Sequence, residues 1–343
     1  MERLLHEHSS FRIFAISGTL TVLTLLAVAF GLGWQAAFIA TLLVIIEITF
    51  SFENAIINAR ILGTMSKFWQ QIFLTIGIFI AIFGMRVIFP IAIVSLTAGL
   101  DWGSVINLAL NEPDKYADEL HHAHPSIAAF GGMFLLMLGL HFFFEKKRHH
   151  WIDMIEKPLE RVGRKWLHAP VSLLILAIVT SLPGVERHAD IWTAGLAGIA
   201  TYLVVHGMSE LFGHQKGLTS TKKKVGMAGF TAFLYLEVLD ASFSFDGVVG
   251  AFAVTSDVLL IAAGLGVGAL WVRSLTVYMV RRGTLEAYRY LEHGAHYTIM
   301  VLASILIMGI FVEVPEAVAG LIGLILIGSS IMGSVRANRV SAA

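Results

Sequence analysis

The sequence contains no cysteine, so disulfide bonds, thiolate ligands for a metal and a cysteine nucleophile are all excluded. It is also poor in charge: Asp, Glu, Lys and Arg make up 14% of its 343 residues, whereas a soluble domain carries about 25%. Acidic and basic residues are equal in number, 24 each, so charge gives no indication of a nucleic-acid partner. No Walker loop, H-E-x-x-H or G-x-S-x-G motif is present, and we therefore expect neither an ATP-driven pump nor an enzyme.

Long apolar runs are what the chain does contain. Hydrophobic residues make up 57% of it and the mean hydropathy is +0.78. Runs of about twenty apolar residues are long enough to cross a bilayer as helices. The expected spans are 13–33, 36–59, 69–98, 126–145, 168–184, 190–212, 227–252, 258–280, 297–313 and 316–334. The fold class is therefore an all-α polytopic membrane protein of about ten transmembrane helices, the first retained rather than removed as a signal peptide.

Basic residues in the connectors predict the orientation, because Lys and Arg in short loops stay on the cytoplasmic side. The connector 146–167 contains KKRHHW followed by four more bases, and the connector after the sixth span contains Lys222-Lys223-Lys224. The loop 99–125 is acidic instead. This alternation predicts a bacterial inner-membrane protein with both termini in the cytoplasm. It also predicts that 146–167 lies on the inner membrane surface as a basic amphipathic segment.

Two stretches of the chain repeat one another. EITFSFEN, which starts at Glu47, returns as DASFSFDG 193 residues later, starting at Asp240. The motif His-x-Ala-His-x-x-Ile also occurs twice, and each half has one arginine in the span between acids and histidines, Arg86 and Arg273. The two acid helices are the second and the seventh expected spans, and because this offset of five is odd, the copies run in opposite directions. This order predicts a 5+5 inverted-topology repeat, with the substrate site near the midplane between the copies.

The repeat also predicts how the chain is divided. We expect a first half over 1–168 with four helices and the connector 146–167, a short fifth helix over 168–185, a second half over 190–335, and a cytoplasmic tail over 336–343.

Five carboxylates lie within the two acid spans, and each costs about 2.5–3.5 kcal/mol at the bilayer centre. They are Glu47, Glu53, Glu237, Asp240 and Asp246. With Arg86 and Arg273, full ionisation leaves a charge of −3, which leaves room for one divalent cation and a proton. The alternative is that these acids pair structurally with the arginines and with hydroxyl groups of neighbouring helices.

Helix geometry limits which of these side chains act together. Glu47, Ser51 and Asn54 share one face, whereas Glu53 points about 120° away and lies about 9 Å along the axis from Glu47. One ion binds both acids only if the helix is interrupted; otherwise the sites are stacked. In antiparallel copies Glu47 and Asp240 meet at the midplane, with Glu53 toward the cytoplasm and Asp246 toward the outside. The candidate ligands are all oxygens, which suit Mg²⁺, Ca²⁺ or Mn²⁺.

Histidines and glycines complete the candidates. The repeated histidines are expected at opposite ends of the ion path: His121, His124, His293 and His296. One interpretation is that they gate the path, carry protons or contact an entering metal. The alternative is that they are only polar helix ends at the membrane interface. His141-Glu145 and His206-Glu210 are expected to be plain interfacial pairs, with an inner vestibule as the alternative. His149, His150 and His168 are expected to be solvated. Gly131-Gly132 and Gly264-x-Gly266-x-Gly268 predict close helix packing rather than nucleotide binding.

The paired stretches EITFSFEN and EVLDASFSFDG, together with HHAHPSIAAFGGMFLLM and LEHGAHYTIM, resemble the TerC-like integral membrane proteins. The resemblance runs from about 35 to 335 and is to a branch labelled only as a domain of unknown function, within the wider lysine-exporter superfamily. It implies metal-ion efflux, of Mn²⁺ in particular, through Glu47, Glu53, Asp240 and Asp246. Asn54 matches the acid-Asn element of that family, whereas the second copy has Gly247 and so either lacks this ligand or takes it from Glu237.

Together these patterns favour a secondary transporter that exports a divalent cation by alternating access, with Mn²⁺ ahead of Ca²⁺ and Mg²⁺. Its ligands would be the four acids just named, completed by Ser51, Asn54 and Ser244. Arg86 and Arg273 would replace the ion's charge when the site is empty, and one carboxylate would carry a counter-proton. No cofactor is expected; the partners are the ion and the bilayer, and a homodimer stays open. The alternatives are a carrier of monovalent cations or protons and a non-transporting membrane scaffold in a metal or tellurite stress response.

Overall fold

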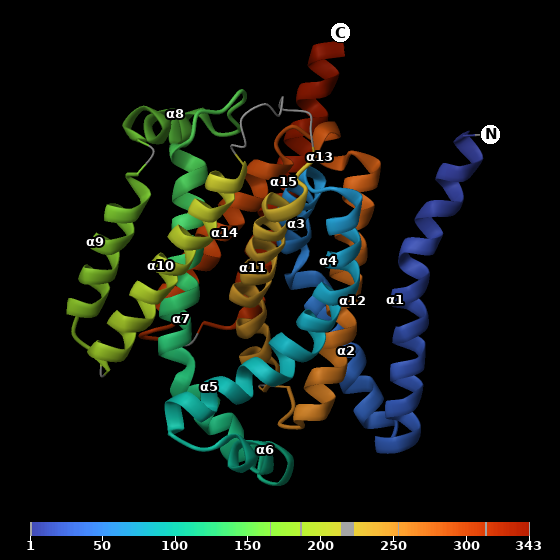
Figure 1. Cartoon of the computed structure of the whole chain (residues 1–343), viewed down its shortest axis with the longest axis vertical. Coiled ribbons are helices and arrows are strands. Elements are labelled where there is room, and N and C mark those ends of the chain that lie inside the picture. Colours follow the sequence, from blue (N-terminus) through green and yellow to red (C-terminus); the bar gives the residue numbers. More distant parts are fainter. Residues whose placement is uncertain are drawn as a thin grey trace. The chain divides into compact units, whose positions relative to one another are not determined.

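The computed structural model describes residues 2–164, 166–185, 187–213, 223–252, 254–312 and 314–342 (Figure 1). Within these ranges the side chains of 2–12, 50, 209–210, 212–213, 245–246, 316–317 and 340–342 are not described. Nearly all of the described residues are helical, and no strand is found among them. The all-α fold class expected from the apolar runs is therefore confirmed.

The chain forms two compact units. Unit 1 is Met1–Ala123 with Lys223–Gly283, and unit 2 is His124–Lys222 with Thr284–Ala343. Unit 1 contains α1 (Glu2–Leu32), α2 (Trp34–Phe50), α3 (Phe52–Thr64), α4 (Lys67–Phe79), the π-helix η1 (Ile80–Ile88), α5 (Phe89–Ala98), α6 (Trp102–Asn111), the start of α7 (Pro113–Phe144), α11 (Gly226–Phe252) and α12 (Val258–Arg282). Unit 2 contains the rest of α7, α8 (Asp153–Val162), α9 (His168–Ser181), α10 (His188–Gly213), α13 (Thr284–Ala287), α14 (Leu291–Met308) and α15 (Glu316–Ala342).

Seven helices in the described part of the chain are long and apolar enough to cross a membrane, and the bent pair α2–α3 makes an eighth if it is one span. The chain is therefore a helical membrane protein. Each of the ten expected ranges contains a helix, but α9 has only 14 residues and α11 carries three acids. The number ten thus stays a prediction.

The span Lys67–Ala98 is continuous but changes its helical geometry before Pro90. Pro90 lacks an N–H group, and its ring clashes with the carbonyl of Arg86 in a regular α-helix. The preceding turns adopt the wider π-helix η1, which relieves such a clash and is frequent at functional sites. The segment that precedes Pro90 is thus π-helical, and it contains Arg86.

Glycines of α12 allow this helix to pack closely against α2. A Cβ atom on Gly264 would lie 2.6 Å from the Cβ of Leu43, and one on Gly268 would lie 2.5 Å from the Cβ of Glu47. Both distances are too short for a side chain, so the two backbones approach each other as in small-xxx-small helix pairs. The packing role expected for these glycines is confirmed.

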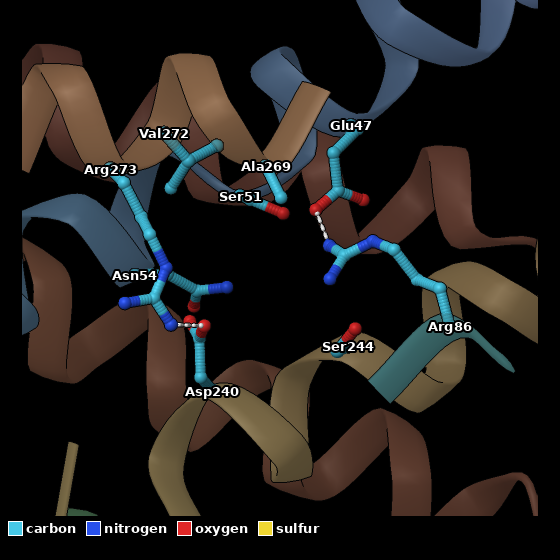
Figure 2. Close-up of a pocket in the computed structure, with 9 residues that line it drawn as sticks. All are labelled: Glu47, Ser51, Asn54, Arg86, Asp240, Ser244, Ala269, Val272 and Arg273. Atoms are coloured by element: carbon cyan, nitrogen blue, oxygen red, sulfur yellow. Dashed lines mark hydrogen bonds and ion pairs between the residues drawn. The ribbon is translucent and has the colours of Figure 1, made fainter. Parts of the chain in front are cut away.

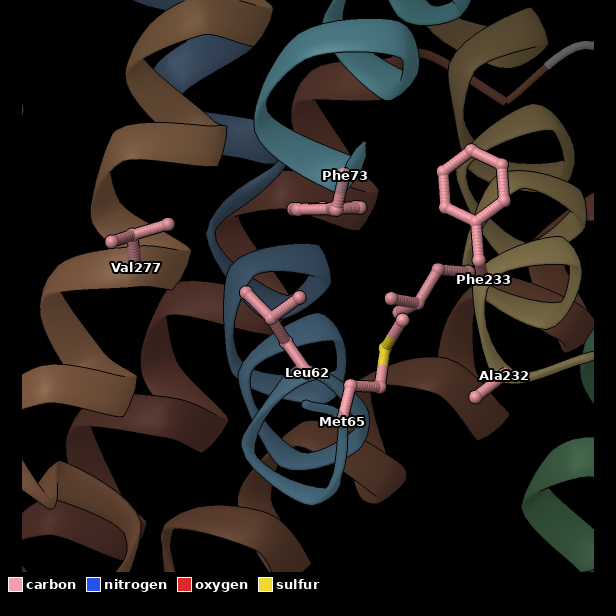
Figure 3. Close-up of a cluster of buried hydrophobic side chains, with 7 residues drawn as sticks. Leu62, Met65, Phe73, Ala232, Phe233 and Val277 are labelled. Carbon is pink, nitrogen blue, oxygen red and sulfur yellow. The ribbon is translucent and has the colours of Figure 1, made fainter. Parts of the chain in front are cut away.

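One apolar cluster in unit 1 joins α3, α4, α11 and α12 (Figure 3). Its buried members are Leu62, Met65, Phe73, Ala232, Phe233, Leu236 and Val277. They come from the segment 62–65 at the end of α3 and from α4, α11 and α12. The helices that carry the repeated acids and arginines are therefore held in one unit by close apolar packing.

Candidate functional site

The first acid stretch is interrupted in its middle. α2 ends at Phe50 and α3 begins at Phe52, with a bend of 52° between the two helix axes. Ser51 lies at the break, with φ −102° and ψ 18°, and its N–H donates to the carbonyl of Glu47 at 3.0 Å. Of the two alternatives that the spacing left open, the interrupted helix is thus the one observed.

A pocket in unit 1 collects polar side chains of both acid stretches (Figure 2). Its lining residues are Glu47, Ser51, Asn54, Arg86, Asp240, Ser244, Ala269, Val272 and Arg273. Three matched pairs occur among them: Glu47 with Asp240 and Ser51 with Ser244, each 193 residues apart, and the two span arginines. The pocket is therefore lined by matching positions of the two similar sequence stretches.

Glu47 and Arg86 form one ion pair of the pocket. The Arg86 guanidinium donates to a carboxylate oxygen of Glu47 and to the carbonyl of Ala81, one turn back in η1. Both side chains are buried, with 6% of Glu47 and 3% of Arg86 exposed. A buried carboxylate needs such a partner, because an isolated charge at this depth is very unfavourable.

Asp240 and Arg273 form the second ion pair, on the opposite side of the pocket (Figure 2). The Arg273 guanidinium lies 2.8 Å from Asp240 and 3.4 Å from Glu237, and donates to the carbonyl of Phe73 at 2.9 Å. It also lies over the Phe73 ring, 4.1 Å from the centroid, in the arrangement of a cation–π contact. A Cβ on Gly77 would lie 2.5 Å from both Arg273 and Glu237, so glycine is what lets the arginine reach this position.

Two neutral oxygens of the pocket have no hydrogen-bond partner among the described residues, Asn54 Oδ1 and Ser244 Oγ. Both side chains are buried, and buried polar atoms in native proteins are nearly always satisfied by protein, water or a ligand. The free space beside them is about that of one water molecule or one small ion. With the carboxylates, these atoms make an oxygen-only set of potential ligands, which suits hard cations.

Three of the acids predicted to bind a metal are not shown to face this space. Glu53 is buried on α3, but it is not among the pocket's lining residues. Glu237 contacts Arg273, which lines the pocket, but is not itself among the lining residues. The side chain of Asp246 lies outside the described residues. Within the described side chains, no three or more His, Asp or Glu groups are arranged to hold a metal ion.

The repeated histidines differ between the two copies. His121 is exposed and His124 half-buried on α7, whereas His293 and His296 are buried at the start of α14. His293 Nδ1 lies 3.0 Å from a carboxylate oxygen of Glu156 in α8, a pairing the sequence does not reveal. The ring of His296 stacks on Phe142 with centroids 3.8 Å apart. In the second copy these histidines therefore make packing contacts within unit 2.

A second group of histidines meets in unit 2. The ring of His141 lies 4.4 Å from that of His206 and 5.1 Å from that of His168, centroid to centroid, and Tyr202 stacks on His206. The expectation that His168 is solvated is wrong, since 3% of it is exposed. It begins α9 instead of belonging to the connector, and its ring turns inward. Glu145 is exposed, and the side chain of Glu210 lies outside the described residues.

Comparison with known proteins gives one match. A family model described as "Protein of unknown function (DUF475)" matches residues 52–341. No curated protein and no solved structure matches the chain. The expected match to a domain of unknown function is thus confirmed, whereas its relationship to TerC-like proteins and their superfamily stays a prediction.

Proposed function

The chain belongs to the family described as protein of unknown function DUF475, and from this premise we propose that it is a secondary transporter exporting a divalent metal cation. Mn²⁺ is the first candidate, followed by Ca²⁺ and Mg²⁺. The observation that carries the proposal is the pocket of unit 1, where Glu47 and Asp240 face buried, unpartnered oxygens of Asn54 and Ser244. Buried polar atoms are nearly always satisfied, and a bound ion would give these two oxygens a partner inside the pocket.

The arginines supply the positive charge that a cation would bring. Each pocket carboxylate is paired with one guanidinium, so the pocket is neutral when all four groups are ionised. A divalent ion binding to Glu47 and Asp240 would compete with Arg86 and Arg273 for the same oxygens. Alternation between arginine and metal avoids leaving a bare carboxylate in the membrane at any stage.

Entry of two positive charges into this neutral pocket needs further compensation. Glu237, which touches Arg273, and the buried Glu53 are carboxyl groups that release or take up protons when nearby charge changes. Asp246, in the same helix as Asp240, is a third candidate. Loss of protons from these groups as the metal binds would couple export to proton import.

The inverted repeat belongs to this proposal. The matched residues of the pocket support it, as does the course of the helices within unit 1: α2–α3 and α11 run in opposite directions, and so do α4–α5 and α12 (Figure 1). A 5+5 arrangement of ten spans, a relationship to TerC-like exporters and an inner-membrane location with cytoplasmic termini are part of the same proposal. The site between two opposed copies is typical of alternating-access transporters.

One observation favours a non-transporting scaffold as the second candidate. Glu47 and Asp240 each already have an arginine partner, and buried ion pairs also occur as purely structural elements. A scaffold needs the pairs for folding only. It therefore predicts a membrane protein that folds and moves no ion.

Metal flux in proteoliposomes with a pH gradient tests the proposal. We expect the wild type to move Mn²⁺, and Asp240→Asn and Asp246→Asn to lose most of this flux. Asp101→Asn is the matched control, because Asp101 is an exposed residue that caps α6 through Ser104, and asparagine can also cap.

Each other outcome has a defined meaning. If Asp240→Asn transports as well as the control, the pocket is not the site. If no gradient drives Mn²⁺, Ca²⁺ or Mg²⁺, divalent export is wrong. Proton or Na⁺ flux would then identify the monovalent carrier, and no flux at all would identify the scaffold.

A further inference from the structure

The short helix α8 turns its two glutamates inward and its bases outward, and one acid, Asp153, is exposed beside Lys157 and pairs with it at 2.6 Å. Glu156 is fully buried and accepts from the backbone N–H groups of Trp151 and Ile152 as well as pairing with His293. Glu160 bonds to His150 at 2.6 Å, and this hydrogen bond holds the pKa of Glu160 below its usual range. Both glutamates of the helix therefore turn toward the protein, where histidines offset their charge.

The outward face of α8 is basic on one side and apolar on the other. Lys157 and Arg161 are exposed, and Arg164 is exposed just beyond the helix. In the same helix Met154 is 84% exposed and Val162 65%, and Trp166, which follows the helix in the chain, is 65% exposed. On a helix of 100° per residue, Met154 and Arg161 lie about 20° apart, with Lys157 on one flank and Val162 on the other. Exposed apolar side chains of this size have a cost in water that an interfacial position removes.

Contacts within unit 2 place this face at the end of membrane-crossing helices. α8 follows the end of α7 after eight residues, and Glu156 ties it to the first turn of α14. Trp151 packs against α15 near Gly333 and against Tyr297 of α14, with ring centroids 5.5 Å apart. The helix is thus anchored where spans end, at the depth at which Trp and basic residues meet lipid headgroups.

From this arrangement we propose that the outward face of α8 binds the anionic headgroups of the surrounding bilayer. Lys157, Arg161 and Arg164 contact the phosphates, while Met154, Val162 and Trp166 enter the interface beside them. The adjoining basic and apolar strips fit the two layers of a membrane surface, whereas a protein partner would need a matching acidic and apolar strip at this depth. The proposal does not depend on whether the protein transports ions.

Lipid selectivity of the intact protein is the first test. In detergent micelles titrated with phosphatidylglycerol or phosphatidylcholine, native mass spectrometry counts the lipids that stay bound. We expect the wild type to prefer phosphatidylglycerol and Lys157→Gln with Arg161→Gln to bind it about thirtyfold more weakly, about fivefold for each charge removed.

The control variant is Lys115→Gln with Arg187→Gln, which removes two exposed bases that, like Lys157, pair with a nearby acid on their own segment. It should bind phosphatidylglycerol like the wild type. Equal loss in both variants would mean a general charge effect and would overturn the proposal.

Immersion of the apolar strip is the second test. Because the chain has no cysteine, Met154→Cys provides a single site for a nitroxide label in nanodiscs. We expect the label to be more accessible to oxygen, which concentrates in lipid, than to a water-soluble nickel chelate, and more so with anionic lipid than without. Access to the chelate in both lipids would overturn the proposal. Protection from both reagents would also overturn it, because a protein surface or a second copy would then cover α8.

Discussion

Unit 1 and unit 2 both bury ionisable side chains, but they do so in different surroundings. In unit 1, carboxylates and arginines form separate pairs around a small space that two neutral oxygens also face. In unit 2, Glu156 and five histidines are packed among aromatic rings such as those of Phe142 and Tyr202. Atoms without a hydrogen-bond partner occur in both units, for example Ser244 Oγ in unit 1 and Ser172 Oγ in unit 2. In unit 1 they belong to residues that line a small pocket between two ion pairs. Burial of charge therefore indicates a candidate substrate site where the charges also line a free space.

Removal of one arginine should give the largest effect and tests the balance of charge in unit 1. Arg273→Gln leaves Asp240 and Glu237 without their cation in a buried position, and we expect a loss of about 3–5 kcal/mol of stability. Thermal unfolding in detergent would measure it. Adding Asp240→Asn should recover part of the loss, and Arg187→Gln, at an exposed pair, should cost no more than about 1 kcal/mol. If Arg273→Gln unfolds at the wild-type temperature, the pairing is unimportant for the fold.

The corresponding change in unit 2 should be smaller and should depend on pH. Burial raises the pKa of Glu156, whereas the hydrogen bond and the charge of His293 lower it. The lowering effects together are larger, so the pKa of Glu156 lies below its usual value of 4.5. A lowered pKa means that the ionised carboxylate stabilises the fold above pH 4.5, and that this contribution is lost as the pH falls through the lowered value. We expect Glu156→Gln to cost about 1.5–3 kcal/mol at pH 7.

The melting temperatures of the wild type and Glu156→Gln, measured from pH 7 down to pH 3.5, would check this expectation. The difference between the two proteins should be constant down to about pH 4.5 and should then shrink. A constant difference throughout would show that the Glu156 carboxylate does not stabilise the fold through its charge. Glu145→Gln is the control, since Glu145 is exposed at the end of α7.

Close packing beside the pocket should give the smallest of the three effects. A Cβ on Gly268 meets Glu47, so Gly268→Ala should displace α12 from α2 and cost about 1–3 kcal/mol. Gly63→Ala, in α3 of the same unit, has no atom within 4 Å of the new Cβ and should be neutral or slightly stabilising. Comparison of the two melting temperatures would separate overpacking from the change in helix propensity. Equal melting temperatures of the two variants would show that α2 and α12 are not closely packed at Gly268.

Much of the candidate site follows from patterns along the chain. The repeated stretch predicts that Glu47, Ser51, Asp240 and Ser244 belong together, and all four line the pocket. The single arginine in each following span, Arg86 and Arg273, lines it as well. The inclusion of Glu53 does not follow in the same way, because helix geometry directs it away from Glu47 and the bend at Ser51 does not bring it into the pocket. The repeat motif selects equivalent residues, but not the direction of each side chain.

By itself, the sequence determined that the protein is helical, that it belongs in a membrane, and which acids and arginines of the two similar stretches lie together at one pocket. These properties depend on apolar length, on local spacing and on repetition, all of which can be read along one chain. The tertiary structure alone decided that α2 breaks from α3 at Ser51, that each pocket acid has its own arginine, and that Glu156 meets His293. The ion pairs among these features join residues that are 33 to 137 positions apart in the sequence. They arise from the packing of whole helices, for which a single sequence carries no local signal.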